Sequence, residues 1–177
     1  MKRSICFFIV ILSLLLPACT MSHSVNDDSS SPENKTPDEI SKETLSQIIS
    51  CFENDDNSEL KKMMSDYIIN NDSQLDNEIE DAFDFIDGKI VSYDNPFANA
   101  MGSHEKKACG GRVTNIITEN GTEYSISFTG WLTYDSDESK IGVEGIRIVN
   151  DTLGAEYPYD ATEDELADCM LKIGHFE

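Results

Sequence analysis

The chain has 177 residues, of which 34 are acidic and 13 are Lys or Arg, and its formal net charge at pH 7 is −21. A surface this acidic repels nucleic acid and anionic lipid headgroups, so net charge alone makes neither of them a partner. The length is sufficient for one folded domain with a sizeable core, preceded by shorter segments.

The first 18 residues are typical of an export signal. Lys2 and Arg3 provide a positive start, and residues 5–16 form an apolar run too short to span a bilayer. The run ends in Leu-Pro-Ala-Cys at residues 16–19, which resembles the lipobox of bacterial lipoproteins. The resemblance implies cleavage before Cys19, attachment of acyl chains such as palmitate to Cys19, and a membrane anchor on the extracytoplasmic face. The alternative is an ordinary cleaved signal that precedes a cysteine by chance.

Residues 19–35 are rich in Ser, Asn and Asp and predict a flexible polar tether, because they cannot bury enough apolar surface to fold. The folded domain is expected over residues 36–177. Within it, Cys51, Cys109 and Cys169 allow either one disulfide with one free thiol or three reduced thiols.

Three helices are predicted at the start of this domain, because apolar residues recur at helical spacing over residues 37–53, 58–69 and 74–87. Thr36 and Glu39 form a capping box at the start of the first helix, and Gly88 ends the third.

The second half of the domain predicts mainly antiparallel strands. Short β-rich or alternating runs indicate strands at residues 89–93, 112–118, 124–134 and 141–149, and Asn120-Gly121 is typical of a hairpin turn. Residues 94–111 are expected to form a long connection, and Thr162 with Glu165 predicts a short C-terminal helix. Helices followed by a meander indicate an α+β fold.

This order of elements resembles the nuclear transport factor 2-like cone, the cystatin-like arrangement shared by ketosteroid isomerase and SnoaL-like proteins. The helical opening at 36–67, the FDFIDGKI segment at 83–90 and the GVEGIRIV segment at 142–149 resemble the uncharacterised domain-of-unknown-function family 5104. The resemblance implies three helices packed on a curved antiparallel sheet, with a pocket inside the cone.

Aromatic side chains are the candidates for this pocket, namely Tyr67, Tyr93, Tyr124, Phe128 and Tyr134. Buried tyrosines with satisfied hydroxyl groups are the simpler interpretation of them. His104 and Cys109 in the long connection lack a third group for nucleophilic catalysis, and no spacing of ligands predicts a metal site or a cofactor. Strand alternation places Trp131 on the polar face, where it is a candidate interface residue for a partner or a homodimer.

Two main functions follow from these features, beside a third possibility, an interaction domain with a filled cone and a Trp131 patch on its surface. The first is a non-enzymatic binding or interaction module, anchored to the membrane through Cys19, that holds a small ligand in the cone or a cell-envelope protein on the sheet. The alternative is an enzyme of the isomerase or dehydratase type, which requires ionisable side chains that converge inside the cone.

Overall fold

The computed structural model describes residues 35–155, 162, 164 and 166–175. The export signal, Cys19 and the tether as far as residue 34 lie outside the described residues. Every described residue belongs to one compact unit, residues 31–177. Among the described residues, no helix has the length and apolar character needed to cross a membrane.

Among the described residues of this unit, four helices come first, and six strands with three short helical turns follow them. The helices are α1 (Pro37–Asn54), α2 (Asn57–Met63), α3 (Asp66–Asn71) and α4 (Leu75–Phe85). The strands are β1 (Ile90–Ser92), β2 (Phe97–Gly102), β3 (Lys106–Thr118), β4 (Glu123–Tyr134), β5 (Gly142–Asn150) and β6 (Met170–Gly174). The turns are η2 (Glu138–Lys140), α5 (Asp151–Gly154) and η3 (Ala167–Cys169).

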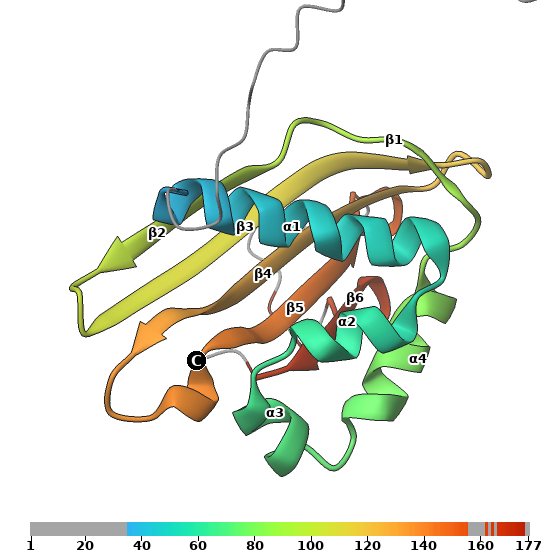
Figure 1. The fold of residues 1–177 in the computed structure, drawn as a ribbon. Helices are drawn as coiled ribbons and strands as arrows, with labels where there is room; N and C mark the ends of the chain where they lie inside the picture. The colour runs from blue at the N-terminus through green and yellow to red at the C-terminus, as the bar shows by residue number, and fades with distance from the viewer. Residues whose placement is uncertain (1–34, 156–161, 163, 165, 176–177) are drawn as a thin grey trace, which may run out of the picture. The chain divides into compact units, whose positions relative to one another are not determined.

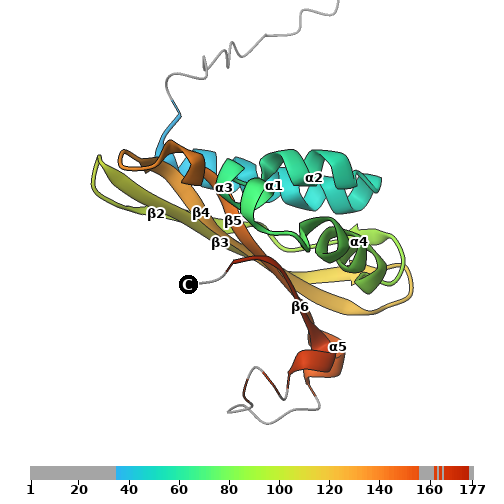
Figure 2. The same ribbon diagram turned by 90° about the horizontal axis from the view of Figure 1, so that it is seen from below.

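The strands form one open antiparallel sheet, so the predicted α+β class is confirmed. Its order is β1-β3-β4-β5-β6, and β2 pairs with β3 beside β1 (Figure 1). Helices α1, α2 and α4 lie on one side of the sheet (Figure 2). The core is therefore formed between the helices and the inner side of the sheet, where Val113, Ile126, Phe128, Ile146 and Ile148 are buried.

The start of α1 matches the prediction from the sequence. The Thr36 hydroxyl accepts a hydrogen bond from the Glu39 amide at 3.3 Å, and the Glu39 carboxylate accepts one from the Thr36 amide at 2.7 Å. These reciprocal bonds satisfy backbone donors that the first turn of a helix leaves unpaired.

The single helix predicted over residues 58–69 is wrong, because the chain breaks it into α2 and α3. Met64 is extended, and the Ser65 amide donates a hydrogen bond to the Val143 carbonyl of β5 at 2.8 Å. The Ser65 hydroxyl then caps α3 by accepting from the Ile68 amide. The backbone at the break thus extends the sheet beside β5, where β6 does not reach.

The long connection predicted over residues 94–111 is also wrong. Most of it forms β2 and the first half of β3, which pair with each other from Phe97–Arg112 to Gly102–Lys107. Ala98 and Cys109 are buried on the inner side of this pairing. Small residues dominate the stretch, so its strand character arises from tertiary pairing more than from intrinsic propensity.

The predicted C-terminal helix is wrong as well. After the single turn η3, the chain forms β6, and Leu171 and Ile173 pair with Ile148 and Ile146 of β5. Apolar residues two apart in a short segment fit a strand that buries one face, and burial of that face against the core stabilises the strand. Glu165, the second residue of the predicted capping box, lies outside the described residues.

At each edge of the sheet, a carboxylate from a helix accepts a hydrogen bond from a backbone amide of the edge strand. The Asp38 carboxylate accepts a hydrogen bond from the Ala100 amide of β2 at 2.9 Å. The Glu78 carboxylate accepts one from the Gly174 amide of β6 at 2.8 Å. Both bonds fill donors that an edge strand otherwise leaves open to another chain.

Two glycine-to-alanine substitutions distinguish the loss of stability caused by backbone strain alone from the loss caused by strain together with a steric clash. Gly121 and Gly174 both have positive φ, but an added Cβ meets nothing at Gly121 and lies 2.4 Å from the Glu144 carbonyl oxygen at Gly174. We expect Gly121→Ala to lower the free energy of unfolding by about 1–2 kcal/mol. Gly174→Ala is expected to lower it by about 3 kcal/mol or more in urea denaturation. Equal losses would contradict the close approach of β6 to Glu144.

Candidate functional site

A small cavity lies between the helices and the inner side of the sheet. Its volume is about 160 Å³, below the roughly 300–1,000 Å³ of typical ligand sites. Helices α1 and α2 and strands β3, β4 and β5 contribute its walls, which are formed by Thr44, Gln47, Met63, Cys109, Trp131, Leu132, Gly142 and Val143.

Cys109 is the one ionisable side chain among the described residues that line this cavity. Burial raises the pKa of its thiol to about 11, so the thiol is protonated near neutral pH. His104 lies in the exposed turn between β2 and β3, where its carbonyl accepts a hydrogen bond from the Thr133 hydroxyl at 3.0 Å. A buried neutral thiol is a poor nucleophile, and the cavity therefore lacks the groups needed for acid–base or covalent catalysis.

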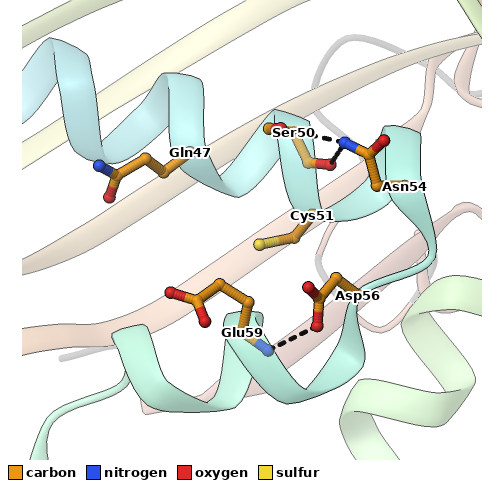
Figure 3. A pocket seen from close by; sticks show the side chains of 6 residues that line it. All are labelled: Gln47, Ser50, Cys51, Asn54, Asp56 and Glu59. Atoms are coloured by element: carbon orange, nitrogen blue, oxygen red, sulfur yellow. Dashed lines mark hydrogen bonds between the residues drawn. The ribbon is translucent and has the colours of Figure 1, made fainter.

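A second, more open groove of about 350 Å³ lies between α1 and α2 (Figure 3). Its polar side chains are already engaged in the local structure. Asn54 donates to the Ser50 carbonyl at 2.7 Å, and Asp56 accepts from the Glu59 amide at 2.9 Å as the N-cap of α2. The first contact lies within α1 and the second caps α2, so both groups serve the local helical structure.

Cys51 faces this groove but is itself buried. Burial raises the pKa of the Cys51 thiol, and the nearby carboxylates of Asp56 and Glu59 raise it further. The thiol is therefore the stable form, so the groove offers no activated nucleophile. All three cysteines of the domain, including Cys169, are free and buried, which selects three thiols from the two alternatives left by the sequence.

Tyr124 and Phe128, two of the five pocket candidates, are core residues. The Tyr124 side chain is 1 % exposed, and its hydroxyl donates to the Phe85 carbonyl at 3.1 Å and accepts from the Asp87 amide at 3.0 Å. Tyr124 thereby secures the end of α4 against β4. Phe128 is also 1 % exposed and packs within the main hydrophobic cluster.

The other candidates lie nearer the surface. Lys140 lies 4.8 Å from the ring centroid of Tyr67 and 5.4 Å from that of Tyr134, so it links these two side chains. Tyr93 is 41 % exposed and follows β1. The five candidates thus occupy the core, a cation–aromatic contact and the surface, and the structure does not gather them around one cavity.

Trp131 is half-buried at the margin of the small cavity. Its ring makes an edge contact with Tyr134, and Lys106 lies 4.4 Å from the Trp131 centroid and 4.5 Å from the Tyr134 centroid. The sequence did not single out Lys106, because its place beside Trp131 depends on the register of β3 with β4. Strand alternation alone carries no signal for that register.

Within the described part of the chain, no cluster of His, Cys, Asp and Glu is arranged to hold a metal ion. His175 is close to Asp72, with 3.7 Å between Nε2 and the carboxylate, and it packs edge-on against Tyr67. These contacts attach the end of β6 to α3.

Comparison with family models matches residues 47–151 to a family described as a domain of unknown function, DUF5104. The matched range runs from the middle of α1 to the start of α5 and includes β1 to β5, but not β6. A search of curated proteins found no match.

The buried hydroxyl of Tyr124 provides a test of its structural role. Tyr124→Phe leaves the Asp87 amide without its acceptor, so we expect a loss of about 1–3 kcal/mol in the free energy of unfolding. The matched change Tyr93→Phe, at an exposed position, should alter stability by less than about 0.5 kcal/mol. Urea denaturation of both variants measures the difference, and equal effects would contradict the assignment.

The thiol of Cys109 predicts a dependence of stability on pH. Its pKa is about 11 in the folded chain against 9.0 for the unperturbed group, so the folded state holds this proton more tightly. Its contribution is full below pH 9 and declines as the pH rises toward 11. Urea denaturation across this range should show a shallower decline for Cys109→Ala than for the natural chain. Parallel curves would show that Cys109 does not titrate as its burial requires.

Proposed function

This chain belongs to the DUF5104 family, and we propose that it is a lipid-anchored interaction module on the extracytoplasmic face of a bacterial cell membrane. The folded part is a nuclear transport factor 2-like domain whose helices fill the space that other members of that superfamily use as a pocket. The placement of α1, α2 and α4 on one side of the sheet supports this proposal (Figure 2).

The side chains that line the small cavity favour binding over catalysis. Isomerases and dehydratases of this superfamily need ionisable groups that converge on a substrate. The described residues that line the cavity of about 160 Å³ supply only the Cys109 thiol, with its raised pKa. The geometry therefore agrees better with a protein that binds a partner through its outer surface than with an enzyme that converts a substrate inside the cone.

The N-terminal sequence supports the anchor. A positive start, an apolar run and Leu-Pro-Ala-Cys at residues 16–19 are the features that direct lipid attachment to Cys19. Two or more acyl chains hold a protein stably at a bilayer without a membrane-spanning helix. The polar residues that follow would link the acidic domain to the anchor.

Lipid attachment at Cys19 is tested with the full chain produced in a bacterium. We expect the membrane fraction to contain a mature protein whose N-terminal peptide carries acyl chains on Cys19 by mass spectrometry. Cys19→Ser should abolish the adduct, whereas the control Cys6→Ser should retain it, because residue 6 leaves with the signal. An unmodified protein released by cleavage at another bond would refute the anchor.

The interaction role is tested by native mass spectrometry of the protein extracted from that membrane. A module that acts through its surface should appear alone, as a homodimer or with a bound protein. A small molecule retained by the domain, and lost on substitution of Leu132 by Trp to fill the cavity, would favour the pocket alternative.

A further inference from the structure

Two of the most exposed apolar side chains lie on the edge strand β2. Phe97 and Met101 are each 69 % exposed, and they alternate with Ala98 and Ala100, which face the core. Because successive residues of a strand point to opposite sides of a sheet, Phe97 and Met101 point away from the helices.

The strand register continues this outer side across β3 and β4. Phe97 pairs with Arg112, Met101 with Ala108, Ala108 with Trp131, and Lys106 with Tyr134. Residues that are paired across antiparallel strands share one side of the sheet. Register shifts flank the pairs of Trp131 with its neighbours, and Trp131 lies at the rim, where it borders the small cavity as well as this side. We call this surface the basic–aromatic face, and it consists of Phe97, Met101, Lys106, Arg112, Trp131 and Tyr134.

The charge of this face is opposite to that of the chain, whose net charge is −21. The row that begins at Phe97 and Arg112 continues through Ser127 to Arg147 and Lys172. The next rows on this side lead from Arg112 toward Lys106 and Tyr134. None of the described strand residues paired in these rows is Asp or Glu.

Acidic residues lie at the margins of this face, and one, Glu144, lies between its rows. Glu105 and Asp135 occupy the turns beyond Lys106, where they line one hollow with it. Glu144 lies at the β-bulge of β5 and is not part of a paired row. Asp151 approaches from α5 and accepts a hydrogen bond from Ser125, which also accepts one from Arg112 at 3.0 Å. Arg112 remains exposed despite this contact.

The chain outside the structure joins the domain beside the same strand. Residues 19–34 precede Lys35, the first described residue, and the Asp38 carboxylate at the start of α1 binds the Ala100 amide of β2. The tether that the sequence predicts there would have a root-mean-square reach of roughly 20–25 Å. A lipid at Cys19 would therefore hold the edge of the sheet that carries Phe97 and Met101 close to the bilayer.

We propose that the basic–aromatic face docks on the anionic headgroup region of the bilayer to which the chain is anchored, an inference that rests on the proposed lipid anchor. Phe97 and Met101 enter the interface between headgroups and acyl chains, and Trp131 and Tyr134 lie at headgroup depth. Lys106 and Arg112 contact the lipid phosphates. The acidic helices then face away from the membrane.

Trp131 is the only tryptophan of the chain, so its fluorescence reports on this face directly. The lipidated chain, with its Cys19 adduct verified by mass, is reconstituted in phosphatidylcholine vesicles with or without phosphatidylglycerol. We expect a blue shift of Trp131 emission and quenching by brominated acyl chains when phosphatidylglycerol is present, and reversal of both by salt. Emission that is insensitive to lipid composition and to brominated chains would overturn the proposal.

The cations are tested in a mature chain, residues 19–177, that carries Cys19→Ser and so binds vesicles without an anchor. Lys106→Gln with Arg112→Gln should lower cosedimentation with phosphatidylglycerol vesicles roughly 30-fold, from the loss of two cations at an anionic surface. The control, Lys42→Gln with Lys62→Gln, removes the same charge from exposed positions on α1 and α2 and should leave binding unchanged. Equal losses in the two pairs would show that net charge alone governs binding, and would overturn the docking face.

The apolar contribution is tested with Phe97→Ser and Met101→Ser together, after circular dichroism has shown that the fold is retained. We expect weaker vesicle binding and a monomer in sedimentation equilibrium both before and after the change. A natural dimer that these substitutions dissociate would instead make the face a contact between copies and overturn the proposal. An absent lipid adduct, with salt-sensitive vesicle binding of the Cys19→Ser chain, would refute the anchor and leave the docking face intact.

Discussion

Strands β3 and β4 run antiparallel from Lys106 and Tyr134 at one end to Ile117 and Glu123 at the other. Every other strand is attached to this pair, with β1 and β2 on β3, and β5 followed by β6 on β4. The side of the pair that faces the helices buries the core, and the opposite side forms the basic–aromatic face. A slip of one residue in this register would exchange the two sides, so burial of Ile126 and Phe128 also fixes the position of Trp131.

The parts of the fold that could be predicted from the sequence are those with strong local signals. Thr36 and Glu39 begin α1 as expected, and the alternating run around Ile126 forms β4. The break at Met64 and Ser65 has no comparable signal, because the apolar spacing continues through it and the cause is a hydrogen bond to a strand far along the chain. The β2–β3 pairing was missed for the same reason, since its alanines and glycines adopt strand geometry only when a partner strand is present.

The candidate site was harder to predict than the fold. Tyr124 and Phe128 satisfy the pattern of a pocket wall and of a core equally well, and the packing of α4 against the sheet decides between them. The sequence also predicts repulsion from anionic lipids, because net charge is an average over the whole surface. The register concentrates Lys106 and Arg112 on one side of the sheet, and this distribution is invisible to composition. The net charge of a protein therefore describes its solubility better than it describes which surfaces its individual faces can contact.

The two carboxylates at the sheet edges have a meaning that extends beyond one molecule. Asp38 and Glu78 each hold a backbone amide that could otherwise pair with a strand of a neighbouring copy. Copies held on one membrane by the proposed anchor would move in two dimensions and would meet far more often than the same number in free solution. Crowding of this kind favours strand-to-strand growth, and two acidic side chains at the margins oppose it without any change in the core. Part of the acidity of this chain thus acts as insulation between neighbours.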